Sequence, residues 1–121
     1  MAKSLSVQEL LSIIEAEIVL DDGWIRDGIT SISASDLMSD ILSHSKPKSV
    51  LLTGLTNPQT IRTAEMVEIA AVCFVLGKVP HEETVELARK NQMPLLTTPL
   101  SMFDACGKLY AAGLNTPDDA L

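Results

Sequence analysis

The longest apolar run of the chain most constrains what it can fold into. Residues 70–76 read Ala-Ala-Val-Cys-Phe-Val-Leu, and a Gly-Lys-Val-Pro segment follows them. The run is short for a buried helix, and the glycine and proline behind it favour a strand that stops there. A strand that is apolar on both faces is typical of a parallel sheet with helices on both sides. The run therefore predicts a central strand of an α/β protein.

Strands and helices alternate regularly from residue 49 onward. We expect strands at 49–53, 70–76 and 95–97, and helices at 57–68, 81–90 and 98–112. Asn57 and Thr98 are the expected caps of the first and the last of these helices. The helix at 81–90 has acidic residues early and basic residues late, as the helix dipole favours, and Asn91 is its expected left-handed stop. Short connections between such elements favour right-handed crossovers and a parallel sheet. The predicted fold is a three-layer α/β domain with helices on both faces of a mostly parallel sheet of about 4–5 strands. One domain is expected over residues 1–113, followed by a flexible tail at 114–121.

The N-terminal part of the chain gives mixed signals. Ser6-Val7-Gln8-Glu9 has the pattern of a capping box, so a helix is expected to run from there to about Glu15. The apolar residues 18–20 predict a short strand, which the sequence Asp-Asp-Gly ends. The segment 24–33 is ambiguous, and we expect a loop with a short strand near 29–32.

A serine-rich segment predicts the start of the second helix. Ser33 or Ser35 is expected to cap it, and Asp36 suits the positive end of the helix dipole. In that helix Asp36 and Asp40 would lie on one face, because they are four residues apart. Such a carboxylate pair could act as acid and base, but a solvated helix face explains it more simply.

Charge and composition exclude several classes of function. The 121 residues form one domain, and 46% of them are hydrophobic. The net charge of −7 repels phosphate backbones and anionic lipids, and the nine Lys and Arg residues form no cluster. We therefore expect neither a nucleic-acid partner nor a membrane partner.

The cysteines and histidines predict no metal site and no cofactor. Cys73 and Cys106 lie in apolar stretches without CxxC spacing, and His44 and His81 are far apart. Buried free thiols fit a reducing compartment, no signal peptide is recognised, and no apolar run is long enough to span a membrane. The sequence thus favours a cytoplasmic protein.

No known catalytic motif is present. Gly77-Lys78 lacks the surroundings of a phosphate-binding P-loop, and neither a G-x-G-x-x-G nor a G-x-S-x-G pattern occurs. His81 could be a general base, but it is more simply a surface residue at the start of a helix. We therefore expect no catalytic residues and no enzyme.

The carboxyl ends of the predicted strands form the candidate ligand site. Ligands of open parallel sheets bind at this edge, and two of these strand ends lead directly into helix N-termini, which favour anions. The predicted ligand-binding residues are Thr53, Gly54, Thr56, Asn57, Gly77, Lys78, Thr97 and Thr98, together with Ser35 and Asp36 at the predicted start of the second helix. The alternative is that these residues only cap helices and form turns.

Several segments between Ser35 and Tyr110 carry a family resemblance. They are the residues 34–41 (Ala-Ser-Asp-Leu-Met-Ser-Asp-Ile), 53–58 (Thr-Gly-Leu-Thr-Asn-Pro), 75–80 with 82–84, and 94–103, which contains Thr-Thr-Pro-Leu. In these segments the chain resembles the DRTGG-domain family, in particular its short stand-alone members encoded beside iron-hydrogenase genes in anaerobic bacteria. The Asp-Arg of the family name is absent, and its Thr-Gly-Gly is reduced to Leu76-Gly77-Lys78.

The resemblance implies a fold similar to the N-terminal domain of HPr kinase/phosphorylase, and often a homodimer. It also implies an accessory role, as in regulatory inserts of some nucleotide-regulated pyrophosphatases and phosphotransacetylases. The first hypothesis is therefore a non-catalytic dimeric regulatory or interaction module, linked to iron-hydrogenase or redox metabolism and acting on a protein partner. The alternative is a sensor that binds a small anion or an adenine nucleotide at the strand-end loops.

Overall fold

The predicted apolar strands lie at the centre of a five-stranded sheet in the computed structural model, which describes residues 3–114. The strands are β1 (Glu17–Leu20), β2 (Ile32–Ala34), β3 (Val50–Thr53), β4 (Ala71–Phe74) and β5 (Leu95–Thr97), in the order β1-β5-β4-β3-β2. Strands β2 to β5 are parallel, whereas β1 pairs with β5 in the antiparallel direction. The mostly parallel sheet is confirmed.

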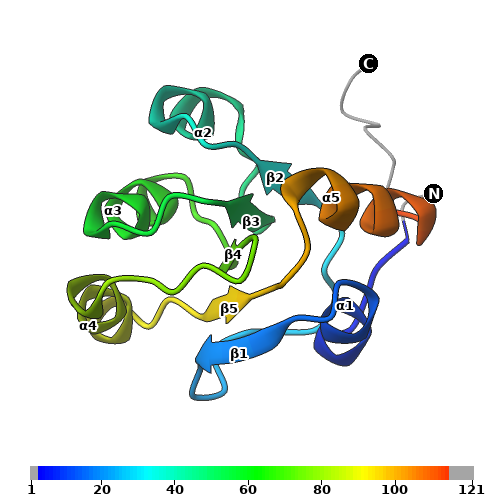
Figure 1. Ribbon diagram of the computed structural model, residues 1–121, viewed down its shortest axis with the longest axis horizontal. Helices are drawn as coiled ribbons and strands as arrows, with labels where there is room; N and C mark the ends of the chain where they lie inside the picture. Colours follow the sequence, from blue (N-terminus) through cyan, green and yellow to red (C-terminus); the bar gives the residue numbers. More distant parts are fainter. Residues whose placement is uncertain (1–2, 115–121) are drawn as a thin grey trace.

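Helices cover both faces of this sheet (Figure 1). On one side lie α1 (Val7–Ile13) and α5 (Met102–Ala111). On the other side lie α2 (Met38–His44), α3 (Pro58–Met66) and α4 (Glu82–Asn91), packed in that order against one another. The three-layer α/β architecture predicted from the sequence is therefore confirmed.

Alternate residues of the central strands supply two separate apolar cores. Val50, Leu52 and Cys73 pack toward α1 and α5, while Leu51 and Phe74 pack toward α2, α3 and α4. All five side chains are fully buried. This period of two explains why residues 71–75 contain no polar side chain, since both faces of the strand must be apolar.

The capping residues that the sequence predicts are confirmed at several helices. The Ser6 hydroxyl accepts a hydrogen bond from the Glu9 N–H, and the Glu9 carboxylate accepts one from the Ser6 N–H. Asn57 caps α3 through its side-chain oxygen, with Pro58 at the first helical position. In α4, Glu82 and Glu83 lie in the first turn and Arg89 and Lys90 in the last turn, as the helix dipole favours.

The structure of the serine-rich segment differs from the prediction. Strand β2 lies at Ile32–Ala34 rather than 29–32, and Ile29 instead forms an isolated bridge with Leu5. Helix α2 begins only at Met38, so Asp36 lies in the loop before it and shares no helical face with Asp40. The Ser35 hydroxyl accepts a hydrogen bond from the Leu37 N–H, which forms a tight turn before the helix.

Three smaller boundaries also differ from the prediction. Helix α5 is capped by Ser101 rather than by Thr98, and the left-handed residue after α4 is Gln92 rather than Asn91. Strand β4 ends at Phe74, because Leu76 and Gly77 both turn to positive φ. No helix within residues 3–114 has the length and apolar character that a membrane crossing requires. The predicted tail at 114–121 lies, apart from Leu114, outside the described residues.

The two thiols give a test of the packing. Burial raises the pKa of the Cys73 thiol to about 12, and it also raises the pKa of Cys106, which is only partly buried. At about pH 8 a disulfide reagent should label Cys106 slowly and leave Cys73 unlabelled until urea unfolds the chain, because the thiolate is the reactive form. Mass spectrometry of the labelled peptides measures this difference. Fast labelling of Cys73 in the native protein would contradict its place in the core.

The raised pKa of Cys73 makes the free energy of unfolding depend on pH. Ionisation of Cys73 is harder in the folded state, so alkaline pH favours the unfolded chain. The contribution of Cys73 to the free energy of unfolding is complete below pH 9 and is lost as the pH rises toward 12.

Candidate functional site

The carboxyl ends of the four parallel strands meet at one edge of the sheet (Figure 1). The loop after β2 carries Asp36, the loop after β3 carries Gly54, and the loop after β4 carries Lys78. A methyl group built on Gly54 would lie 3.0 Å from the Lys78 Nζ and 3.3 Å from an oxygen of Asp36. The sheet therefore brings together three residues of the predicted site, from three different loops.

Asp36 is the hydrogen-bond acceptor at this edge. Its carboxylate accepts hydrogen bonds from the Gly54 N–H and from the Thr53 hydroxyl. The Lys78 Nζ lies 3.5 Å from the Gly54 carbonyl oxygen, at the limit of a hydrogen bond. The Gly54 N–H, which an anionic ligand would use, thus already donates to a carboxylate of the protein itself.

The loop between β3 and α3 is held by its own side chains. The Thr53 hydroxyl also accepts a hydrogen bond from the Leu55 N–H, and Asn57 caps α3. The carbonyl of Thr56 accepts hydrogen bonds from the Thr84 hydroxyl and from the His81 N–H. Thr53 and Asn57 therefore hold the loop internally, and the Thr56 carbonyl fixes it to the start of α4.

The loops after β4 and β5 are tied to each other. The N–H of Leu76 donates to the Leu100 carbonyl at 2.8 Å, and the N–H of Gly77 donates to the Thr98 carbonyl at 2.7 Å. Thr97 lies within hydrogen-bond reach of the Phe74 and Lys78 carbonyls. The left-handed conformation of Leu76 and Gly77 directs both N–H groups toward the neighbouring loop.

Thr98 differs most from the expectation. Its side chain is fully buried, and its hydroxyl donates a hydrogen bond to the Ile14 carbonyl at the end of α1. The same oxygen accepts a hydrogen bond from the Leu100 N–H. This hydroxyl holds α1 against the β5–α5 turn and is directed into the protein, away from a ligand at the edge.

Only a few of the predicted site residues converge at this edge. Of the ten predicted site residues, Asp36, Gly54 and Lys78 converge, and most of the others hold the loops in place. His81 is the N-cap residue of α4 but makes no side-chain capping bond. Within residues 3–114, no group of three or more His, Cys, Asp or Glu side chains is placed to hold a metal ion. Whether the predicted residues bind a ligand stays a prediction.

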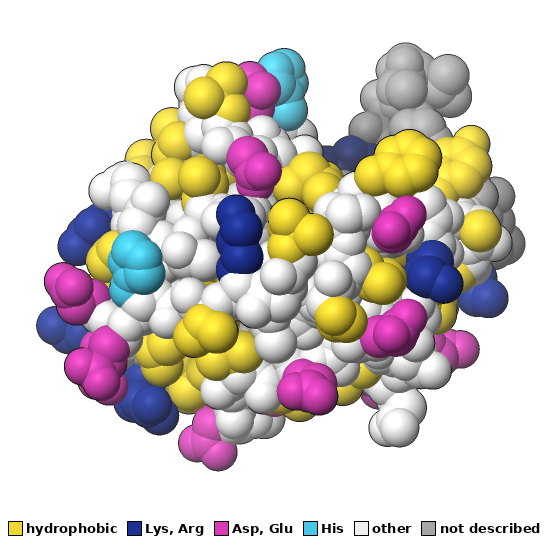
Figure 2. Space-filling model, in the orientation of Figure 1, with side chains coloured by type: hydrophobic (Ala, Val, Ile, Leu, Met, Phe, Trp, Pro, Cys, Tyr) yellow, Lys and Arg dark blue, Asp and Glu magenta, His cyan; other side chains and the backbone are white. Residues whose placement is uncertain are grey.

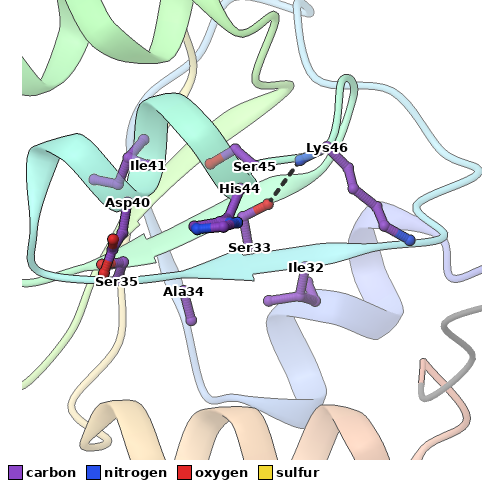
Figure 3. A pocket seen from close by; sticks show the side chains of 9 residues that line it. All are labelled: Ile32, Ser33, Ala34, Ser35, Asp40, Ile41, His44, Ser45 and Lys46. Atoms are coloured by element: carbon purple, nitrogen blue, oxygen red, sulfur yellow. Dashed lines mark hydrogen bonds between the residues drawn. The ribbon is translucent and has the colours of Figure 1, made fainter. Parts of the chain in front are cut away.

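Sequence reasoning missed the cavity between β2 and α2. It has a volume of about 330 Å³ and is lined by Ile32, Ser33, Ala34, Ser35, Asp40, Ile41, His44, Ser45 and Lys46 (Figure 3). Of the predicted site residues, only Ser35 lines it. The cavity depends on where β2 ends and α2 begins, and the serine-rich sequence gave no clear signal for either boundary.

The contact between Asp36 and Gly54 can be tested by stability. Asp36→Ala leaves the Gly54 N–H and the Thr53 hydroxyl without their acceptor, and we expect it to lower the free energy of unfolding by about 1 kcal/mol. Asp36→Asn keeps one acceptor oxygen and should lose less. Asp22→Ala is the control, because an exposed residue in a turn should change stability by less than about 0.5 kcal/mol. Urea denaturation measures all three, and equal stability of Asp36→Ala and the wild type would contradict the contact.

Comparison with known proteins identifies the kind of fold. No protein-family model and no curated protein matches the sequence. Among solved structures, the chain is similar to the CBS and DRTGG domains of the regulatory region of the Clostridium perfringens pyrophosphatase, in complex with its activator diadenosine tetraphosphate. The TM-score is 0.71 at 16% sequence identity, over 89% of this chain and 47% of the other, so the present chain spans about half the length of that protein chain. The α/β fold of this chain is therefore similar to that of DRTGG/CBS-type regulatory domains.

Proposed function

We propose that this chain is a non-catalytic regulatory module that acts by contact with another protein molecule, in the first place a second copy of itself. The observation that carries the proposal is the character of the strand-end edge. Its polar groups bond to one another, whereas large apolar side chains beside them are exposed: Leu76 by 59%, Val79 by 81% and Phe103 by 84%. Exposed apolar side chains that gather on one face are typical of interaction sites.

The placement of these side chains supports the proposal. Leu76 and Val79 lie in the loop after β4, and the N–H of Leu76 is bonded to Leu100, which precedes α5 and Phe103. Figure 2 shows hydrophobic side chains in front of β4, β5 and α5, next to one basic side chain. A rigid loop pair that presents apolar groups loses little conformational entropy on binding, which favours association.

The family resemblance of the sequence suggests the setting of this role. It directs the search for a protein partner to iron-hydrogenase and other redox systems. The solved structure with a similar fold belongs to a regulatory region of an enzyme, which agrees with an accessory role for this chain.

The oligomeric state tests the proposal. At high micromolar concentration we expect light scattering after size exclusion to give the mass of a dimer. The double substitution Val79→Asp and Phe103→Asp should halve this mass, because it places charges on the apolar surface. Met66→Asp is the matched control, since Met66 is 71% exposed but lies at the end of α3. A wild-type monomer, or a dimer that survives the double substitution, would overturn the self-association at this surface.

A small-anion or adenine-nucleotide sensor is the second candidate function. It is favoured by the convergence of Lys78 and the Gly54 N–H at the edge where ligands of parallel sheets bind. The similar solved structure, whose regulatory region holds diadenosine tetraphosphate, favours the same class of ligand. In this candidate the ligand phosphate displaces the Asp36 carboxylate from Gly54.

Thermal shift with phosphate, AMP, ATP and diadenosine tetraphosphate tests this candidate. A ligand at a hundred times its dissociation constant should stabilise the protein by about 2.7 kcal/mol. Gly54→Val should abolish the shift, since the added atoms meet Lys78 and Asp36, and Lys78→Ala should reduce it. Lys108→Ala, on α5, is the control for the loss of one positive charge. The absence of a shift with all four compounds would rule the candidate out.

A further inference from the structure

The cavity between β2 and α2 lies against the free edge of the sheet. β2 is the last strand of the sheet, and within residues 3–114 β3 is the only strand that pairs with it. Four consecutive residues of the chain, 32–35, line the cavity. Successive side chains of a strand point to opposite faces, so a cavity lined by all four must contact the strand along its edge.

The register shows which backbone groups face this edge. The Ser31 carbonyl accepts from the Val50 N–H, and the Ser35 N–H donates to the Leu52 carbonyl, so these groups point toward β3. In a parallel ladder the direction alternates along the strand, so the N–H and C=O groups of Ile32 and Ala34 point away from β3. The cavity therefore has a row of backbone donors and acceptors along one wall.

Side chains of α2 form the opposite wall. Asp40 and His44 are four residues apart and so share one face of the helix, beside the fully buried Ile41. Figure 3 places His44 between the Asp40–Ser35 end of the cavity and the Lys46 end. Ser33 lies below His44, and its hydroxyl accepts a hydrogen bond from the Lys46 N–H. The wall thus combines an imidazole ring, a carboxylate and apolar surface.

We propose that this cavity binds the purine ring of an adenosine compound. The Ile32 carbonyl and the Ala34 N–H, as neighbouring acceptor and donor, match the 6-amino group and the N1 atom of adenine. His44 supplies a ring to stack on the base, and the Asp40 carboxylate is an acceptor for ribose hydroxyls. The volume of about 330 Å³ lies in the range of small-molecule sites.

An extended peptide added to the edge is the competing occupant. β2 has only three residues, and the backbone N–H and C=O groups of only two of them, Ile32 and Ala34, point away from β3. A peptide strand added there would therefore gain few main-chain hydrogen bonds. A flat ring needs only one donor and acceptor pair and fits between the strand and α2. The strand length therefore favours the ring.

The inference rests on the nucleotide-sensor candidate, to which it adds a binding place for the base. It differs in location from the strand-end loops around Gly54, which would hold phosphate. Ser35 lines the cavity and the next residue, Asp36, bonds to Gly54, so the two places adjoin. Variants at each place can therefore be compared separately.

Titration calorimetry and amide NMR with adenosine test the inference. We expect adenosine to bind and to shift the amide signals of residues 32–35 and 40–46. Ala34→Pro removes the outward N–H at an edge position that tolerates proline, and it should weaken binding about tenfold. His44→Ala is the second variant, with an expected loss of several-fold, in case the proline perturbs the strand. Purine riboside, which lacks the 6-amino group, should bind more weakly than adenosine.

The outcomes separate this inference from the candidate function. If adenosine nucleotides bind, but Ala34→Pro and His44→Ala bind them like the wild type, the base lies elsewhere and only the inference is overturned. If no adenosine compound binds, the inference is overturned, and the sensor candidate falls with it when phosphate also gives no thermal shift. If an acetylated extended tetrapeptide binds with sensitivity to Ala34→Pro while adenosine does not bind, the edge is a strand-addition site and the inference is also overturned. Melting curves of each variant confirm that it is folded.

Discussion

The burial of β3 and β4 on both faces is the constraint on which the structure depends. The residues Val50, Leu51 and Leu52 and the run Ala71–Phe74 have no exposed side-chain surface. Two helical layers are needed to exclude water from these strands, and parallel pairing needs helices in the connections. The same constraint brings the carboxyl ends of β2 to β5 to one edge, so the location of a candidate site follows from the core rather than from any motif.

Long-range hydrogen bonds then make that edge rigid. Thr98 connects β5 to the end of α1 across 84 residues of sequence, and Thr84 connects α4 to Thr56. The paired turns at Gly77 and Thr98 fix the last two loops to each other. A rigid edge presents its groups in one arrangement, and this favours recognition with a small entropic cost. Because most polar groups of this edge bond to one another, a ligand would have to compete with these internal hydrogen bonds.

The extent to which the sequence predicts this molecule depends on the range of the interactions. Strands β3 to β5 and the caps at Ser6 and Asn57 were predicted because each depends on residues within a few positions. The boundary between β2 and α2 was not, because several serines there offer competing turns and caps, and the pairing with β3 decides among them. The role of Thr98 was also missed, since its partner Ile14 lies far away in the sequence.

In the candidate site, too, the sequence predicts the location of the loops but not the contacts between them. The sequence identified the loops of the strand-end edge, because parallel topology places them together. It could not show that Asp36 occupies the Gly54 N–H, since that contact joins two loops 18 residues apart. Ser35 lies in the cavity wall and the next residue, Asp36, bonds to Gly54 at the strand-end edge, so the two candidate sites are directly adjacent in the chain. A ligand in the cavity would influence the strand-end edge only by contacts that differ between two states of this segment, because that difference is what couples two sites.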